Sequence, residues 1–369
     1  GVLTAVILPA RACAILAGSM RALVFRDVET VCHETVPDPG IRSPGDAIVR
    51  VERTGICGSD LHVYHGRETG LDAGTVMGHE LVGEVVATGR EVRTFAVGDL
   101  VASPFTTSCG KCFYCARALT ARCTAGQLFG WVQGGAGLQG CQAEYVRVPL
   151  AESTLAKVPE GVDADVALLA GDALATGYFC AHAGRAAPGA VVAVLGCGAV
   201  GLMAVVGARE LGAEQVFAVD SLVERLALAE RFGAQPVNLA SDDPVSVVRE
   251  ATDGRGADVV LEVVGTPEAT RLAVDLVRPG GTISAAGVHT EKQFALSPGE
   301  AYDKNLTYRA GRCPARLYID RLMPLVRQKK YELGSIISHR MPLSDGPAGY
   351  YSFQERLSGC TKGVIRPCA

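Results

Sequence analysis

The chain has 369 residues, of which 48% are hydrophobic and 20% are charged, and its formal net charge at pH 7 is −4. This composition excludes an intrinsically disordered chain, and the length allows two domains of ordinary size. Because the sequence contains no block of basic residues, it gives no sign of a nucleic-acid or membrane partner, and a small-molecule substrate is expected.

The first segment, Gly1–Ser19, is apolar, carries only Arg11 as a formal charge and precedes Met20. It could imitate a weak signal peptide, but the charged part that a signal peptide needs is poor. The thirteen cysteines of the chain favour a reducing cytoplasm as its location. We therefore expect residues 1–19 to be a leader or an expression remnant, with Met20 as the true start.

The next region, residues 20–170, has the pattern of an irregular, mostly antiparallel β-barrel. Short alternating or β-branched runs are separated by glycine and proline, and helical periodicity is scarce. The predicted strands are Arg21–Phe25, Ala47–Arg53, Leu81–Ala87, Asp99–Ser103 and Glu144–Val148. The glycine-rich segment 131–140 is expected to form a flexible loop.

Two potential metal ligands of this region stand alone in the sequence. Cys57 lies in the segment Gly55–His62, and His79 is followed by Glu80. A single cysteine is more often a small buried hydrophobic residue, and a single histidine more often satisfies a structural hydrogen bond. Taken one at a time, neither residue predicts a metal site.

Four further cysteines form a compact C-x2-C-x2-C-x7-C pattern, namely Cys109, Cys112, Cys115 and Cys123. Four thiolates suit one tetrahedral zinc ion and leave no position for a substrate, so residues 109–123 predict a structural zinc lobe. Disulfides or unrelated free thiols are the alternative. Such tight spacing is rare by accident, and thirteen cysteines cannot all pair with one another.

After about Ala164 the pattern changes to that of a parallel sheet flanked by helices. The predicted strands are Val191–Gly196, Gln215–Asp220, Ala257–Val264 and Gly281–Gly287. The predicted helices are Leu202–Leu211, Val223–Phe232 and Glu268–Val277. Gly212 and Gly233 are well placed to end the first two of these helices.

A G-x-G-x-x-G turn follows the first of these strands and precedes a helix. It consists of Gly196, Gly198 and Gly201, with Ala199 and Val200 between the last two. In this context the glycines allow a tight turn, close approach of a pyrophosphate and close packing of the helix on the strand. The turn therefore predicts dinucleotide binding. The alternative is a glycine turn that only connects a strand to a helix.

Asp220 ends the next strand, nineteen residues beyond Gly201. A carboxylate at this place can bind the adenosine ribose and repel a 2′-phosphate, which favours NAD over NADP. Arg225, one turn into the following helix, could soften this preference. Asp220 could equally cap the helix that follows Ser221.

Together these motifs resemble the zinc-dependent medium-chain dehydrogenase/reductase family, which includes alcohol, sorbitol and threonine dehydrogenases. The resemblance runs from Met20 to Arg366. It is carried by the motifs Gly55–His62, Gly78–Val86, Cys109–Cys123, Gly171–Gly177 and Gly196–Gly201.

The resemblance implies an α/β architecture with two domains. A GroES-like irregular β-barrel forms the catalytic domain, residues 20–170, and a doubly wound Rossmann domain, residues 171–312, binds NAD. Residues 313–369 return to the catalytic domain, and the active site lies in the cleft between the two.

The resemblance also implies the ligands of a catalytic zinc. Cys57 and His79 would be the first two and Asp172 the third, which leaves a fourth position open for water or substrate. Asp172 has an alternative as the cap of the helix through Ala175. By the same resemblance, Glu80 would approach the metal transiently and Asp60 would orient the ligating imidazole.

Other roles follow from the resemblance in the same way. Ser59 and His62 would pass the proton of the alcohol outward, with an ST-turn hydroxyl and an exposed loop imidazole as the alternatives. Thr176 would lie near the nicotinamide, Val264 would join the cofactor-binding residues, and Arg366 would meet the pyrophosphate. Thr176 and Arg366 could also be plain surface residues.

We therefore expect a dehydrogenase that uses two zinc ions per chain, one catalytic and one structural, and NAD. It would oxidise a small secondary alcohol or polyol to the ketone and form a homo-dimer or homo-tetramer. A formaldehyde-oxidising, aldehyde-oxidising or threonine dehydrogenase-like member of the family is the main alternative. The chain could also be a zinc-free quinone reductase or a non-catalytic NAD-binding protein, but its three potential ligands of a catalytic zinc weigh against both.

Overall fold

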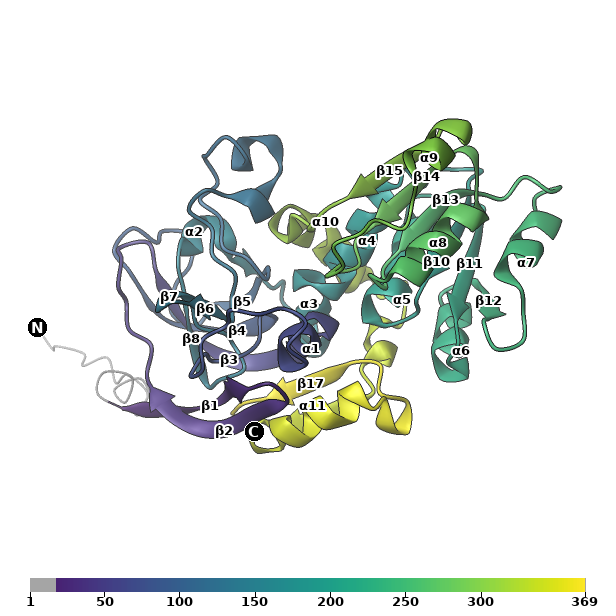
Figure 1. The fold of residues 1–369 in the computed structure, drawn as a ribbon. Coiled ribbons are helices and arrows are strands. Elements are labelled where there is room, and N and C mark those ends of the chain that lie inside the picture. The colour runs from purple at the N-terminus through teal and green to yellow at the C-terminus, as the bar shows by residue number, and fades with distance from the viewer. Residues whose placement is uncertain (1–17, 369) are drawn as a thin grey trace, which may run out of the picture.

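The computed structural model describes residues 18–368 (Figure 1). The expected leader, residues 1–19, lies outside the described residues except for Gly18 and Ser19. Ser19 opens strand β1 (Ser19–Asp27), which forms an antiparallel hairpin with β2 (Thr30–Pro37).

The early part of the chain and its last part build one seven-stranded sheet. Its order is β16 (His339–Pro342), β17 (Gly363–Arg366), β3 (Ala47–Ile56), β4 (Leu81–Thr88), β5 (Leu100–Ser103) and β9 (Ala156–Lys157), while β8 (Tyr145–Val148) also pairs with β3. Apart from the parallel pair of β16 and β17, every strand pair is antiparallel. In Figure 1 the yellow C-terminal strand β17 lies beside β3, so strands from the early and the late parts of the chain pair in this sheet.

A second sheet has six strands, all parallel. Its order is β12 (Gln235–Asn238), β11 (Gln215–Asp220), β10 (Val191–Leu195), β13 (Ala257–Glu262), β14 (Val277–Ala285) and β15 (Thr307–Ala310). The strand order reverses between β10 and β13, and ligands of such sheets bind at this switch point, beyond the carboxyl ends of the strands. The α/β fold with a Rossmann sheet is thus confirmed.

One predicted strand of this sheet is shifted. Gly281–Gly287 was the expected range, whereas β14 begins at Val277 and ends at Ala285. Val277 already pairs with Ala257, and the register then jumps so that Val259 faces Thr282. The Pro279–Gly281 stretch is therefore an irregularity inside the strand and not its beginning.

Helices flank both sheets. They are α1 (Gly58–Tyr64), α2 (Ala151–Thr154), α3 (Ala164–Gly171), α4 (Ala173–Ala183), α5 (Ala199–Glu210), α6 (Val223–Arg231), α7 (Pro244–Glu250), α8 (Pro267–Leu276), α9 (Pro298–Asp303), α10 (Ala315–Gln328) and α11 (Gly346–Gln354). Short 3₁₀ turns are η2 (Cys115–Arg117), η3 (Thr120–Arg122), η4 (Leu333–Ile336), η5 (Leu343–Asp345) and η6 (Leu357–Gly359). Gly212 and Gly233 follow α5 and α6 with φ values of 91° and 87°, which confirms both as helix-ending residues.

Helices α3 and α4 connect the two sheets. Helix α3 contacts β3, β4 and β5, while α4 packs along α5. A Cβ atom at Gly177 would lie 2.4 Å from the backbone nitrogen of Ala204 on α5, so glycine permits this close helix packing. One apolar core cluster consequently runs from Val82 and Ala102 of the first sheet to Val192 and Val194 of the second.

Segment 131–140, expected to be a flexible loop, instead contains a small hairpin of β6 (Trp131–Gln133) and β7 (Ala136–Leu138). Gly134 and Gly135 form its tip with φ values of 59° and 75°, as tight hairpin turns require. The carboxylate of Asp72 accepts hydrogen bonds from both tip amides, at 3.0 and 2.7 Å. These bonds attach the tip of the hairpin to Asp72.

Among the described residues, no single helix is long and apolar enough to cross a membrane. Helices α3 and α4 reach the required length only as a pair that is bent by 42°.

Candidate active site

Cys57 lies at the end of β3, where it is the N-cap residue of α1. Its backbone nitrogen donates a hydrogen bond of 2.9 Å to Oδ2 of Asp60. This short carboxylate bridge fixes the turn between strand and helix. The position of the Cys57 thiol is therefore determined by residues that are adjacent in sequence.

Asp60 also holds His79, which comes from the segment before β4. The Nδ1 atom of His79 lies 3.1 Å from Oδ1 of Asp60, so the Nε2 atom is the one left to face the site. Gln142 Nε2 lies 3.5 Å from Oδ2 of the same carboxylate and donates to the carbonyl of Gly55 at 2.9 Å. A carboxylate behind an imidazole is the usual way to orient a metal-binding histidine.

Asp172 lies at the junction of α3 and α4. It has the N-cap position of α4, but its side chain makes no capping hydrogen bond to the helix. Its Oδ2 atom lies 3.4 Å from Sγ of Cys57 and 3.8 Å from Nε2 of His79. Thr176 Oγ1 lies 3.5 Å from the other oxygen, so Asp172 faces the other two predicted ligands instead of the helix backbone.

The predicted ligand atoms converge. One atom each of Cys57, His79, Glu80 and Asp172 lies within 4.8 Å of the others. A tetrahedral zinc ion with bonds of about 2.0–2.3 Å holds its ligand atoms about 3.3–3.8 Å apart, which is the range that separates Asp172 from the other two. A thiolate, an imidazole and a carboxylate are all zinc ligands, so the residues present fit this metal.

Burial changes the proton affinity of these ligands. Burial and the neighbouring Asp172 raise the pKa of the Cys57 thiol. Burial disfavours the charged form of His79, but the attraction of Asp60 and of Cys57 outweighs it and holds the pKa of His79 well above its ordinary value. A metal ion that binds here must therefore compete with protons for both groups.

Glu80 has a partner that sequence reasoning missed. Its carboxylate is fully buried and forms an ion pair with Lys362, whose side chain is 2% exposed and precedes β17. No function was predicted for Lys362 from the sequence. The weak signal that could have found it is a lysine beside the apolar strand residues Val364 and Ile365.

Ser59 and His62 both come from α1. Ser59 Oγ lies 3.4 Å from Nε2 of His79. His62 is partly buried, and its Nδ1 atom has no hydrogen-bond partner within residues 18–368. Burial lowers the pKa of His62, which favours the neutral imidazole that a proton acceptor needs.

The four cysteines of the predicted zinc lobe also converge, with their sulfur atoms within 4.8 Å of one another. All four are free of disulfides. The backbone nitrogen of Cys109 lies 3.2 Å from Sγ of Cys123, and that of Cys112 lies 3.4 Å from Sγ of Cys109. Backbone amides that donate to its sulfur lower the pKa of Cys112 to about 5, whereas burial raises the pKa of Cys115 and of Cys123.

The glycine turn has the expected geometry. Gly196 has a φ of 88°, and a Cβ atom at Gly201 would lie 1.7 Å from its carbonyl oxygen. Gly198 is the N-cap residue of α5, and a Cβ atom there would meet only Arg225 Nη1, at 3.9 Å. The turn therefore leaves open space at Gly198, and Ala199 and Val200 form the first turn of α5 beside it.

Both carboxylate oxygens of Asp220 accept hydrogen bonds from backbone nitrogens, while the N-cap residue of α6 is Leu222. The Oδ2 atom of Asp220 accepts a 2.7 Å hydrogen bond from the backbone of Cys197, inside the glycine turn. Its Oδ1 atom accepts from Ser221 and Leu222 at the start of α6, at 2.8 and 2.9 Å. Arg225 Nη1 lies 3.9 Å from the same carboxylate. The predicted contact of Asp220 with the adenosine ribose stays a prediction.

The remaining predicted cofactor residues have different surroundings. Val264 is 44% exposed, and its side chain covers Gly196. Arg366 pairs with Asp165 at 3.3 Å, together with Arg53 and Arg340. Its predicted contact with a pyrophosphate stays a prediction.

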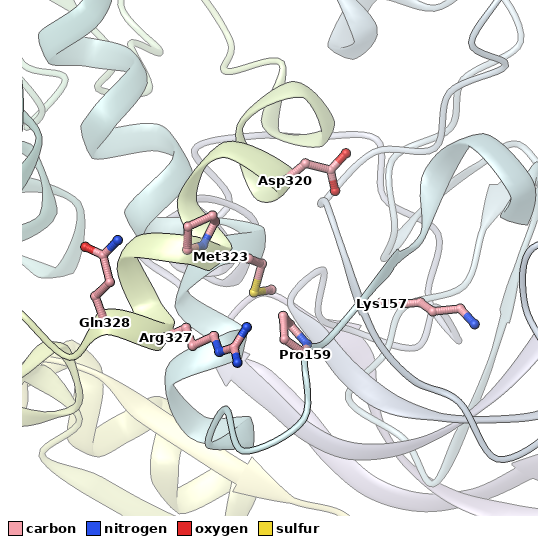
Figure 2. A pocket seen from close by; sticks show the side chains of 7 residues that line it. Lys157, Pro159, Asp320, Met323, Arg327 and Gln328 are labelled. Atoms are coloured by element: carbon pink, nitrogen blue, oxygen red, sulfur yellow. The ribbon is translucent and has the colours of Figure 1, made fainter.

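A surface groove of about 640 Å³ lies elsewhere, between α10 and the segment around β9. Figure 2 shows Met323 and Arg327 reaching from α10 toward Pro159. None of its lining residues belongs to the two clusters of possible metal ligands. The groove is therefore separate from the candidate active site.

Comparisons with known proteins agree with this geometry. Residues 43–160 match the family model "Alcohol dehydrogenase GroES-like domain", and residues 199–327 match "Zinc-binding dehydrogenase". The chain is 43% identical to "Zinc-type alcohol dehydrogenase B" of Aspergillus flavus over 342 residues, which cover 90% of this chain and 78% of that protein.

Two further relatives extend the comparison. "Glutathione-independent formaldehyde dehydrogenase" of Pseudomonas aeruginosa is 34% identical, with 92% of this chain and 94% of that protein covered. The structure of "Alcohol dehydrogenase TADH from Thermus sp. ATN1" superposes with a TM-score of 0.89 at 40% identity and covers 94% of this chain and 99% of that one. The chain therefore belongs to the zinc-type medium-chain alcohol dehydrogenase family, and it is an oxidoreductase that acts on CH–OH groups.

Proposed function

We propose that the protein oxidises a small secondary alcohol or polyol to its ketone with NAD as the hydride acceptor. The observation that carries this proposal is the convergence of Cys57, His79 and Asp172 from three remote parts of the chain. Similarity to proteins named alcohol dehydrogenase supports it. The branches of the family that oxidise secondary alcohols and formaldehyde resemble this chain in having an aspartate at the place of Asp172. An aspartate as the third ligand therefore favours these two classes of substrate.

The residues of the chain would divide the chemistry among them. Cys57, His79 and Asp172 would hold a zinc ion, which when bound makes the alcohol hydroxyl more acidic. Asp60 keeps His79 oriented through its Nδ1 atom. Ser59 would accept the released proton, and His62, whose Nδ1 atom has no partner in the described part of the chain, would pass it toward solvent.

The cofactor would lie along the glycine turn, with its hydride-accepting ring toward Thr176 and Asp172. The open space at Gly198 would take the pyrophosphate, and Asp220, whose carboxylate lies beside the turn, would bind the adenosine ribose. NAD is therefore the proposed cofactor, in preference to NADP.

Oxidation of formaldehyde or another aldehyde is the second candidate. The similarity to a glutathione-independent formaldehyde dehydrogenase favours it specifically, because that relative is matched over nearly its whole length. A threonine dehydrogenase-like activity would make the same demands on the site. In each case the same ligands and the same cofactor site would serve, and only the substrate pocket would differ.

Metal analysis and a substrate panel test the proposal. We expect two zinc ions per chain and NAD-dependent oxidation of butane-2,3-diol and propan-2-ol. If formaldehyde without glutathione is oxidised far faster than either alcohol, the second candidate is correct. A single zinc ion per chain, together with NADPH-dependent reduction of quinones, would overturn both candidates.

We also propose a cytoplasmic homo-dimer or homo-tetramer, in which residues 20–170 and 313–369 form the catalytic domain and residues 171–312 the NAD domain. The sheet that joins β16 and β17 to β3 supports this division. Light scattering of the purified protein measures the subunit number, and a monomer would contradict the proposed assembly.

A further inference from the structure

The ion pair of Glu80 and Lys362 lies directly behind the candidate metal site. Lys362 Nζ contacts Glu80 Oε1 and donates a hydrogen bond of 3.2 Å to the carbonyl of Ile56. The lysine and the glutamate are 2% and 0% exposed in their side chains. Water therefore does not screen this pair, and each charge depends on the other.

The second oxygen of Glu80 has no such partner. Its Oε2 atom is buried and forms no hydrogen bond with any residue of the described chain. A carboxylate oxygen of Glu80 nevertheless lies within 4.8 Å of the ligand atoms of Cys57, His79 and Asp172. A buried anionic oxygen without a partner is costly, and a divalent cation at the site would attract it.

Gly55 makes room for this arrangement. A Cβ atom at Gly55 would lie 2.3 Å from Glu80 Oε2 and 2.9 Å from Lys362 Nζ. The absence of a side chain at Gly55 therefore creates the space in which the carboxylate rests beside the lysine. Any larger residue would displace Glu80 from this place.

The charges of the site explain what Lys362 does. The Cys57 thiolate and the Asp172 carboxylate together balance one divalent ion, and Lys362 balances Glu80. Without Lys362, an uncompensated carboxylate would lie beside the metal in a medium of low dielectric constant. Glu80 would then become a fourth protein ligand and close the position that a substrate needs.

We propose that Lys362 is a positioning residue that holds Glu80 away from the metal and so keeps the fourth coordination position open. This inference rests on the proposed metal site of Cys57, His79 and Asp172, and it adds a function for a residue of the C-terminal segment. Gly55 supports the same function by leaving space for the retracted carboxylate.

The test uses the full-length protein with Co²⁺ in place of the catalytic zinc, because the visible absorption of Co²⁺ reports its coordination. Imidazole is the probe for the open position. We expect imidazole to shift the spectrum of the unaltered protein. In Lys362→Met the half-saturating imidazole concentration should rise by at least about 10-fold, because Glu80 occupies the position.

Two further variants separate positioning from a loss of packing. The double variant Lys362→Met/Glu80→Gln keeps the same lost lysine but removes the competing carboxylate, so its imidazole response should return to within about threefold of the unaltered protein. Lys362→Arg keeps the positive charge, so imidazole should shift its spectrum as it does in the unaltered protein. A normal response of Lys362→Met, or no recovery in the double variant, would overturn the inference.

Gly55→Ala provides an independent route if Lys362→Met does not fold or does not retain Co²⁺. It displaces the carboxylate while keeping both charges, and it should weaken the imidazole response in the same way. Gly45→Ala is the matched control, since a Cβ atom there meets no atom within 4 Å. An unchanged response in Gly55→Ala would also overturn the inference.

The outcome for the unaltered protein separates this inference from the proposed function. If the unaltered protein binds no Co²⁺ at Cys57, His79 and Asp172, the proposed function fails. If it does bind Co²⁺ and responds to imidazole, but the variants respond equally, only the function of Lys362 is refuted.

Discussion

The hydroxyl group of Tyr350 donates a 2.8 Å hydrogen bond to Oε1 of Gln142, although 208 positions separate the two residues. Tyr350 belongs to α11, and Gln142 in turn donates to the carbonyl of Gly55, two residues before Cys57. The C-terminal segment is thereby connected to the support of the candidate metal site. The side chains of Tyr350 and Gln142 are fully buried.

Replacement of Tyr350 by Phe should lower the free energy of unfolding by about 1–2 kcal/mol, because it leaves the buried Gln142 oxygen without a donor. Chemical denaturation measures this change. Tyr351→Phe is the control, since Tyr351 is 56% exposed and should tolerate the change. Equal stability of the two variants would contradict the importance of this hydrogen bond.

Cys57→Ser should reduce the metal content from two zinc ions to one and lower turnover by more than about 100-fold, while NAD binding is retained. The lobe around Cys109 should keep its ion because its four ligands are untouched. Cys32→Ser, outside both ligand clusters, is the control. Elemental analysis, fluorescence titration with NAD and a turnover assay check the three expectations, and near-normal activity of Cys57→Ser would refute the assigned centre.

Metal uptake at the catalytic site should become weaker as the pH falls. The pKa values of Cys57 and His79 are both raised, so protons compete with a metal ion for both groups. Affinity therefore increases with pH until both groups have lost their protons. Competition with a chelator at pH 6 and pH 8 measures this dependence, and equal affinity at the two values would contradict it.

Asp165 should contribute stability that disappears in acid. Burial disfavours its charged form, but hydrogen bonds from Arg340 and Arg53 outweigh burial and lower the pKa of Asp165. A lowered carboxyl pKa stabilises the fold above the unfolded value of about 3.9 and loses this effect as the pH falls through the folded value.

Asp165→Asn should therefore destabilise the protein by about 2–4 kcal/mol at pH 7, because three arginines lose their carboxylate, and the difference should become smaller as the pH falls below about 4. Urea denaturation at pH 7 and at pH 3 measures it. Asp320→Asn is the control, since its ion pair with Arg316 involves a carboxylate that is 67% exposed. A difference that does not change with pH would show that the charge of Asp165 is not responsible.

Asp220→Ala should lower the ratio of kcat/KM with NAD to kcat/KM with NADP by at least about 10-fold, because the carboxylate that repels a 2′-phosphate is removed. Affinity for NAD should also decrease, since the Asp220 carboxylate accepts a hydrogen bond from the backbone of Cys197 in the glycine turn. Asp303→Ala, at an exposed site, is the control. An unchanged cofactor ratio would exclude the proposed contact with the ribose.

Features that depend only on residues close together in the sequence could be predicted without knowledge of the fold. The glycine turn, the four cysteines of the lobe and the helix-ending Gly212 and Gly233 depend on neighbours within about fifteen residues. Their conformational and chemical requirements are therefore visible locally. Prediction was less accurate for β14, where the Pro279–Gly281 stretch suggested a later beginning, because pairing of Val277 with Ala257 is not a local property.

The direction in which a side chain points could not be predicted from the sequence. Asp172 could equally have capped α4, and only the packing of α3 against the first sheet and of α4 along α5 turns its carboxylate toward Cys57. Arg366 forms an ion pair with Asp165 that the sequence did not indicate. In both cases the partner lies far away along the chain, so that no periodicity or spacing reports it.

The sequence by itself determined the family, the two-sheet architecture and the residue types that can bind zinc and a dinucleotide, because short motifs express local backbone and ligand requirements. The tertiary structure alone decided that Lys362 meets Glu80 and that Tyr350 meets Gln142. These contacts arise because β17 returns to pair with β3, which brings residues from opposite ends of the chain into one buried space.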